Sequence, residues 1–531
     1  QGECESEGRK AEATCHAAES ECFSSFGNLL VRDCLCCMNQ FRNWVWEPIV
    51  IVARNHSFLG KGFLVAVGLT AFQISSPGAA AHPKPNIVLI VADDLGYGDL
   101  GCFGQKILKT PRLDAMAREG MRFTQFYAGC TVCAPSRSVL MSGKHSGHTV
   151  VRGNSTAPIV LQPGEPTVAS VLKKAGYKTA CIGKWGIGTP DKLSNPNEVG
   201  FDHFFGYVDM WHAHNFYPEF LIRNGEVQKL KNEVGAKWKK FQIPGKPQAG
   251  RGVAVKRVEY APDLFADEVE KFLRENQQER FFLYYAMNVP HANNEAGKKG
   301  MEVPELGEFA GKDWPEPEKG FAAMIRNIDR DTGRILDLLK ELKIEKETLV
   351  IFTSDNGPHQ EGGHKADFFD SNGELRGIKR DLTEGGIRVP TIAWWPGTIV
   401  AGGEDNAPWY FGDVMATAAE LAGAEAPEDL DSDSFAGPLR GQPREKRWSR
   451  QSTIYWEFYE KGSAQAVRFG KWKAIRRPMF TGEIELYDMS NDAGEKHDHA
   501  KRRPDLTRHA ANLLEKAHVP DPNWKVRGRR E

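Results

Sequence analysis

The chain has 531 residues, of which 40% are hydrophobic and 26% are charged. These proportions are typical of a folded soluble protein and exclude a wholly disordered, collagen-like or multi-span membrane chain. Lys and Arg number 69 and Asp and Glu number 70, which gives a net charge of −1. Because no overall positive charge attracts nucleic acid or an anionic membrane, we expect no nucleic-acid partner and a local cluster for any anion that is bound.

The first 81 residues differ in character from the rest of the chain. Six of the ten cysteines fall within the first 37 positions, so too few remain elsewhere for a disulfide framework. A basic flank at Arg54 and Lys61 precedes an apolar run at 62–74, and small residues follow at 75–81. This order is typical of a secretory signal peptide, and the run is too short to span a bilayer. We therefore expect residues 1–81 to be an N-terminal extension with a signal-peptide-like segment, and the protein to be secreted or periplasmic.

Apolar runs alternate with helical patterns across residues 82–440. The run at 86–92 is continuous and rich in β-branched residues, as expected for a parallel strand covered on both faces. Similar runs lie at 179–183, 281–288, 348–353 and 388–394, and helical patterns lie at 167–175 and 321–342. The alternation predicts a doubly wound α/β catalytic domain, in which a large, mainly parallel sheet lies between layers of helices and ligands bind at the carboxyl ends of the strands.

Residues 441–531 have a different pattern. Short strand-like runs lie at 452–457, 465–468, 472–475 and 484–487, followed by a helical pattern at 505–517. These features predict a C-terminal subdomain made of a small antiparallel sheet and one helix.

Two of the predicted strands end in carboxylates. The first runs into Asp93 and Asp94, and the fourth runs into Asp355 and Asn356. Three carboxylates and an amide oxygen form a set of hard oxygen ligands suited to Ca²⁺ or Mg²⁺ rather than Zn²⁺. The simpler interpretation is that Asp and Asn only end strands and start turns.

A pair of cysteines, Cys130 and Cys133, lies in a segment that suggests three kinds of chemistry. A phosphatase loop requires Arg six positions after its cysteine, but those positions are Ser136 and Val139, which excludes that interpretation. A thioredoxin-like site has the observed Cys-x-x-Cys spacing but needs a preceding strand that is not clear here. The third interpretation uses the whole string, Cys-x-Pro-Ser-Arg with Leu at the seventh position after Cys133 and Gly at the tenth.

This string resembles the signature of the type I, formylglycine-dependent sulfatases, which include arylsulfatases and belong to the alkaline phosphatase-like superfamily. The resemblance covers roughly residues 84–520. It implies that a formylglycine-generating enzyme reads Cys133, Pro135 and Arg137 and oxidises the cysteine to formylglycine. Pro135 suits a first helical turn, which places residue 133 at a helix N-terminus where an anionic adduct is favoured.

The resemblance also implies the remaining site residues. The divalent cation, usually calcium with magnesium possible, would be bound by the formylglycine of Cys133 and by the two pairs at the strand ends. The catalytic residues would be Cys133, Arg137, Lys184, His214, His291 and Lys379. Many members carry His where this chain has Gly186, so another base is required, and His145, His212 and His214 are the candidates.

The activity implied is hydrolysis of an aryl or carbohydrate sulfate ester. The formylglycine hydrates to a gem-diol, one hydroxyl attacks sulfur with Asp355 as base, and the second hydroxyl expels the sulfate. Three alternatives remain open: a phosphonate or phosphate ester hydrolase of the same superfamily, a non-catalytic protein that binds sulfated glycans, and a thiol redox protein. The sequence does not indicate the natural substrate or the oligomeric state.

Overall fold

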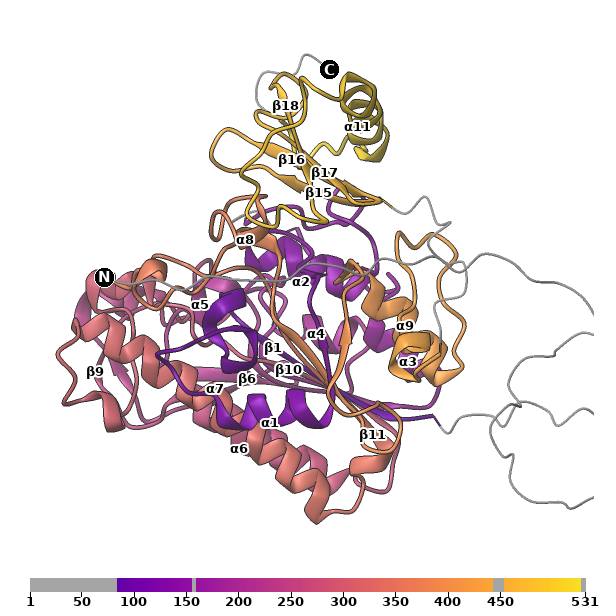
Figure 1. Ribbon diagram of the computed structural model, residues 1–531. Coiled ribbons are helices and arrows are strands. Elements are labelled where there is room, and N and C mark those ends of the chain that lie inside the picture. Colours follow the sequence, from indigo (N-terminus) through magenta and orange to yellow (C-terminus); the bar gives the residue numbers. More distant parts are fainter. Residues whose placement is uncertain (1–83, 155–158, 443–452, 527–531) are drawn as a thin grey trace, which may run out of the picture. The chain divides into compact units, whose positions relative to one another are not determined.

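A computed structural model describes residues 84–154, 159–442 and 453–526 (Figure 1). The N-terminal extension predicted at 1–81 lies outside these residues. Within them, no helix is long and apolar enough to cross a membrane.

The described chain is organised around a ten-stranded sheet. Its centre consists of five adjacent parallel strands: β11 (Thr348–Ser354), β1 (Asn86–Ala92), β10 (Phe281–Ala286), β4 (Lys178–Lys184) and β5 (His203–Tyr207). Every residue of β1 is buried, as expected for the middle of a parallel sheet. The predicted fold, a large and mainly parallel sheet, is therefore confirmed.

The outer pairings of the sheet are antiparallel except for β13, which pairs in parallel with β2. The outer strands are β12 (Thr391–Trp394), β2 (Met121–Phe123), β13 (Gly403–Asp405), β6 (Phe220–Arg223) and β7 (Glu226–Lys229). The strand expected at 388–394 starts only at Thr391 and runs antiparallel to β11. Pro390 precedes it and has no N–H to donate to a ladder, which explains the later start.

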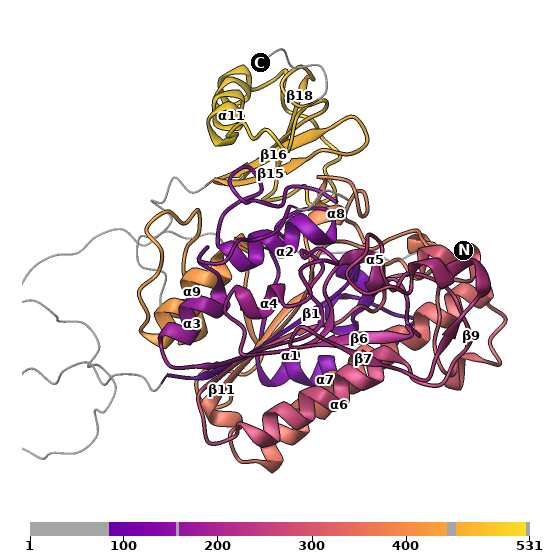
Figure 2. The ribbon, with the colours of Figure 1, turned by 180° about the vertical axis from the view of Figure 1, so that it is seen from behind.

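Helices cover both faces of the sheet, and Figures 1 and 2 show the two groups on opposite sides. One group is α1 (Pro111–Glu119), α6 (Ala261–Glu275) and α7 (Glu316–Glu341), and the other is α2 (Cys133–Ser142), α3 (Val168–Lys174) and α9 (Asp413–Ala422). A hydrophobic core lies on each face of the sheet, and alternate residues of β1 point into one or the other. Ile87 and Leu89 pack on the side of α2, and Val88 and Ile90 pack on the side of α7. The helices predicted at 167–175 and 321–342 correspond to α3 and α7.

Shorter elements connect these layers. They are the helices α4 (Asn195–Glu198), α5 (Met210–Ala213), α8 (Glu384–Ile387) and α10 (Ala436–Leu439), and the paired strands β3 (Phe126–Tyr127) with β14 (Trp409–Tyr410) and β8 (Glu233–Val234) with β9 (Ala254–Lys256).

The C-terminal region forms the predicted small antiparallel sheet. Its strands, in order, are β15 (Ile454–Phe458), β16 (Ala464–Phe469), β17 (Trp472–Arg476) and β18 (Ile484–Asp488). Helix α11 (Pro504–Ala517) packs on this sheet through Ala510 and Leu514. The boundary at 440–441 adjoins residues outside the described ranges and stays a prediction.

A buried ion cluster joins the C-terminal sheet to the main domain. The Lys473 Nζ lies 2.9 Å from Glu384 Oε1 and 2.9 Å from Glu495 Oε1, and all three side chains are fully buried. Tyr127 donates its hydroxyl proton to the other oxygen of Glu384. Burial raises the pKa of Glu495 despite the nearby ammonium. Removing Lys473 would leave the two carboxylates with only the longer ion pairs to Arg388, 3.5 Å from Glu384, and Arg376, 3.7 Å from Glu495.

We expect Lys473→Met to lower the free energy of unfolding by about 3–5 kcal/mol, because breaking a buried pair leaves an uncompensated charge. Lys471→Met is the matched control, since the Lys471 ammonium pairs with Asp488 while its side chain is 55% exposed. The control should change the stability by no more than about 1 kcal/mol. Urea denaturation followed by circular dichroism measures both, and equal stabilities would show that the cluster does not anchor the C-terminal sheet.

Candidate active site

The two carboxylate-bearing strand ends meet at one edge of the sheet. Asp93 and Asp94 follow β1, and Asp355 and Asn356 follow its parallel neighbour β11. All four side chains are buried. The Asp94 N–H donates to Asp355 Oδ1 at 3.1 Å, and the Asn356 amide donates to Asp94 Oδ1 at 2.7 Å. The structure therefore brings the four predicted metal-binding residues together.

Cys133 opens helix α2, and every residue of that helix is buried. The N-cap residue, Val132, makes no side-chain capping bond, so the first N–H groups of the helix and its dipole favour an anion near Cys133. Arg137 lies one turn further along. Its Nε donates to Asp355 Oδ2 at 2.9 Å, and its Nη2 lies 3.7 Å from Asp93 Oδ1.

Two lysines contribute further positive charge to this site. Lys184, the last residue of β4, places its Nζ 2.7 Å from Asp93 Oδ2. The Lys379 Nζ lies 2.7 Å from Asp94 Oδ2 and 3.2 Å from His291 Nε2. Three carboxylates thus face three cations. The carboxylates are those of Asp93, Asp94 and Asp355, and the cations are those of Arg137, Lys184 and Lys379.

The surroundings shift the pKa values of the three carboxyl groups in different directions. Burial by itself would raise the pKa of Asp93, but Lys184 holds it well below its ordinary value. Lys379 likewise lowers the pKa of Asp94 against the effect of burial. Burial and the repulsion of Asp93 raise the pKa of Asp355 to about 7. Lys184, Lys379 and Arg137 therefore balance the charge of the three carboxylates, and Asp355 is the one whose ionised form is least favoured.

Two oxygens at these strand ends show that a hard cation fits here. Asp93 Oδ1 and Asn356 Oδ1 are buried and have no hydrogen-bond partner among the described residues. Buried oxygens without a donor are costly unless an ion or water satisfies them. Carboxylate and amide oxygens are the ligands that Ca²⁺ and Mg²⁺ prefer.

His291 and His214 lie beside this charged cluster. The two imidazole rings are stacked, with centroids 5.0 Å apart and planes 14° from parallel. His291 Nδ1 lies 2.7 Å from the carbonyl oxygen of Ala292, an acceptor, so Nδ1 carries the proton and Nε2 is left as an acceptor toward Lys379. His214 Nδ1 lies 3.3 Å from a carboxylate oxygen of Glu295, whose side chain is only 2% exposed.

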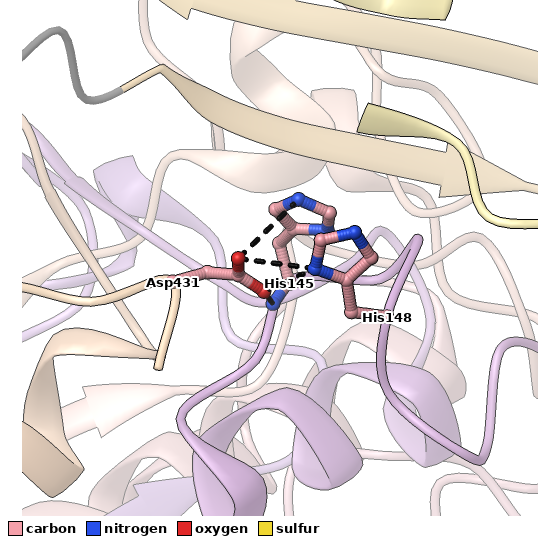
Figure 3. Close-up of side chains that lie close together, drawn as sticks. All are labelled: His145, His148 and Asp431. Atoms are coloured by element: carbon pink, nitrogen blue, oxygen red, sulfur yellow. Dashed lines mark hydrogen bonds and ion pairs between the residues drawn. The ribbon is translucent and has the colours of Figure 1, made fainter. Parts of the chain in front are cut away.

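The other two candidate bases are engaged elsewhere. His212 Nε2 lies 2.9 Å from the carbonyl oxygen of Phe220. His145 belongs to a cluster with His148 and Asp431, in which both rings face the same carboxylate (Figure 3). The Gly147 N–H donates to His145 Nδ1, so the proton of neutral His145 is on Nε2, toward Asp431. Because that proton occupies the position of a metal-binding lone pair, hydrogen bonding accounts for this cluster without an ion.

Three polar residues at the site were not predicted from the sequence. Glu361 pairs with Lys379 at 3.1 Å and with Arg380 at 2.6 Å. Glu295 supports His214, and the Asn154 side-chain oxygen lies 3.8 Å from Cys133 Sγ. Glu361 and Asn154 are on loops and Glu295 lies in a short 3-10 helix (Asn294–Lys299), and none of the three follows a predicted strand.

The cysteines do not form a redox pair. Cys102, Cys130, Cys133 and Cys181 are all free in the described chain. Burial raises the pKa of the Cys130 thiol to about 12 and also raises that of Cys133. The Cys130 thiol contacts the carbonyl oxygen of Glu457 at 3.2 Å, which is a packing role. A thiolate-based activity is therefore disfavoured.

Fold and site together define an α/β enzyme in which buried cations and acidic oxygens lie beside the N-terminus of the helix that Cys133 opens. The family model "Sulfatase" matches residues 85–424, and the model "N-sulphoglucosamine sulphohydrolase, C-terminal" matches 376–519. The chain therefore belongs to the sulfatase family and is a sulfuric ester hydrolase.

Individual proteins agree with this assignment. N-acetylgalactosamine-6-sulfatase of Rattus norvegicus is 34% identical over 77% of this chain and 74% of its own length. Arylsulfatase A of Homo sapiens is 33% identical over 79% of this chain and 84% of its own length. The solved structure of Ps i-CgsB in complex with k-i-k-neocarrahexaose matches with a TM-score of 0.69 and 27% identity, over 84% of this chain and 95% of that one.

We expect Cys130 and Cys133 of the unmodified chain to resist alkylation at pH 8 until the protein is denatured, because burial raises the pKa of both thiols. Peptide mass mapping after brief iodoacetamide treatment, with and without denaturant, measures this directly. Fast labelling of the native protein, or recovery of a disulfide-linked peptide that contains both residues, would restore the redox interpretation.

Proposed function

We propose that this sulfatase hydrolyses a carbohydrate sulfate ester, through a formylglycine derived from Cys133 and with a bound divalent cation, Ca²⁺ in preference to Mg²⁺. The relatives named for aminosugar and aryl sulfates support an ester of this kind. The observation that carries the proposal is the position of Cys133 at the uncapped N-terminus of a buried helix, one turn from Arg137.

The oxygens of Asp93, Asp94, Asp355 and Asn356 would hold the cation. When bound, it would polarise a sulfate oxygen and the oxygen of residue 133, which stabilises the charge of the transition state. Two of these oxygens, Asp93 Oδ1 and Asn356 Oδ1, have no donor among the described residues, which supports the assignment.

A formylglycine at position 133 would supply, once hydrated, one hydroxyl for attack on sulfur and a second to release the sulfate. The remaining groups of the chain have roles that follow from their positions. Arg137 and Lys184 would offset the negative charge of the bound sulfate. Asp355 would accept the proton of the attacking hydroxyl, as the resemblance to the family implies.

Lys379 and His291 would act together at the leaving oxygen. The Nε2 of His291 can only accept, since Nδ1 holds the proton against Ala292. It therefore orients the ammonium of Lys379, and Lys379 is the group that donates a proton to the leaving alcohol.

Gly186 cannot act as the base that a histidine provides at this position in many family members, and His214 would provide that base instead. The carboxylate of Glu295 holds the proton on Nδ1, which leaves Nε2 free to accept one. His145 and His212 have their ring nitrogens engaged in other contacts.

Maturation and location complete the proposal. A formylglycine-generating enzyme would act on Cys133, and the apolar segment before residue 82 would direct the protein to a secreted or periplasmic location. A phosphonate or phosphate ester hydrolase and a non-catalytic glycan-binding protein are the competing functions, and both are tested by turnover of a sulfate ester.

We expect Cys133→Ala to be inactive on 4-nitrophenyl sulfate, because no other side chain at that position becomes an aldehyde. Cys133→Ser should at most accumulate a covalent sulfate adduct, since it has no second hydroxyl to expel the sulfate. Cys130→Ala is the matched control and should retain activity. Turnover assays and intact mass measure these outcomes, and an active Cys133→Ala would refute the assignment of the nucleophile.

Removal of the cation should abolish turnover. Treatment with a chelator should lower activity, and Ca²⁺ or Mg²⁺ should restore it better than Zn²⁺. Asp94→Asn should reduce the metal content measured by mass spectrometry of the purified protein. Asp99→Asn is the control, because Asp99 is equally buried but caps Gly96 outside the site. Full activity in a preparation shown to be free of metal would contradict the proposed role of the cation.

A further inference from the structure

A cavity of about 350 Å³ adjoins the nucleophile, which is within the range of small-molecule sites. Ala134, the residue after Cys133, lines it, as do Gly186, Met210, Trp211 and Trp524. The cavity therefore lies where the organic part of a sulfate ester would extend from Cys133.

Gly186 keeps this cavity open toward the charged site. Its φ is +77°, and a Cβ built there would lie 3.4 Å from Arg137 Cδ and 3.4 Å from Lys184 Cε. Any side chain at this position would enter the space between the cavity and these two cations. Gly186 stands where many family members carry a histidine. Because it has no side chain, it also leaves room beside the position proposed for the sulfate.

The walls of the cavity are largely apolar and rigid. Val151, Ile159, Ile187 and Met210 contribute aliphatic surface. Trp524 is fixed by a hydrogen bond of 2.8 Å from its Nε1 to the carbonyl oxygen of Val150. Trp211 is fixed between the Arg251 guanidinium, 5.1 Å from its ring centroid, and the ring of His214. Two fixed indoles favour a ring-shaped ligand.

The charged residues that line the cavity are acidic. Asp191 and Asp209 line it, and no Lys, Arg or His among the described residues does. Asp209 accepts from the N–H groups of Trp211 and His212, and burial raises its pKa to about 7. Arg251 lies behind Trp211, and the carboxylate of Glu295, 3.3 Å from its Nε, balances its charge.

We infer that this cavity binds an uncharged sugar ring, the ring that carries the scissile sulfate, and that it disfavours rings with a carboxylate or a second sulfate. The inference rests on the proposed function. The indoles would cover the apolar faces of the pyranose, and Gln248, Thr189 and Asp191 would pair with its hydroxyls. A carboxylate on the ring would face two aspartates, and the cations beyond Gly186, Arg137 and Lys184, are already paired with Asp355 and Asp93.

Pairs of sugars that differ only at C6 test this preference without requiring catalysis. We expect saturation-transfer NMR on the full chain to detect binding of methyl galactoside or methyl glucoside, and about tenfold weaker binding of the corresponding uronide, as expected for one unfavourable charge contact. Equal or tighter binding of the uronide, or no binding of either pair, would overturn the inference.

Variants identify the cavity as the place of binding. Trp524→Ala should weaken binding of the neutral sugar about tenfold through loss of stacking, whereas Trp472→Ala, in the C-terminal sheet, should not. Met210→Lys adds a cation to the wall and should shift the preference toward the uronide. Unchanged binding in both Trp524→Ala and Met210→Lys would place the sugar elsewhere and refute the proposal.

The same preparations separate this inference from the proposed function. Hydrolysis of 4-nitrophenyl sulfate with no binding of neutral sugars would leave the sulfatase mechanism standing and refute the assignment of the cavity. Binding of neutral sugars by a fully matured protein that hydrolyses no sulfate ester would refute the proposed function and leave the cavity assignment standing.

Discussion

The repulsion among three buried carboxylates is the constraint on which the rest of the site depends. Asp93, Asp94 and Asp355 lie together because β1 and β11 are parallel neighbours and end at the same edge. Their burial is tolerable only if positive groups reach them. Each of the three cations arrives from a different element: Arg137 from α2, Lys184 from the end of β4, and Lys379 from the loop before α8. The compensation of charge therefore fixes how helix, strand and loop are placed around the edge of the sheet.

The sequence was sufficient to predict the parts of this arrangement that have a local signal. The apolar run at 86–92 is continuous because β1 is covered on both faces, and its register with β11 follows from the parallel order. The positions of Asp93, Asp94, Asp355 and Asn356, which we propose to bind the cation, were predictable because these residues directly follow such strands. The strand at 391–394 was predicted too long, since an apolar run gives no information about the direction of pairing or about the N–H that Pro390 lacks.

Other residues of the site could not be predicted because their positions depend on contacts between distant loops. Glu361 and Glu295 have no strand end or motif beside them, and only the fold brings them to Lys379 and His214. The same holds for the choice of base. His145, His212 and His214 look equivalent in the sequence, but hydrogen bonds to Gly147 and Phe220 engage the first two. Family resemblance supplied the roles, and geometry distinguished between the candidates.

The bond between Trp524 and Val150 has a consequence for the timing of biosynthesis. The two residues are 374 positions apart, and at about 5–20 residues per second the ribosome needs roughly 20–75 s to make the intervening chain. During that interval the segment with Cys133 has been synthesised, but the indole that closes one wall of the cavity has not. In the finished fold Cys133 is only 3% exposed. The formylglycine-generating enzyme that we propose for residue 133 would thus have a limited period in which to act, and slower translation would lengthen it.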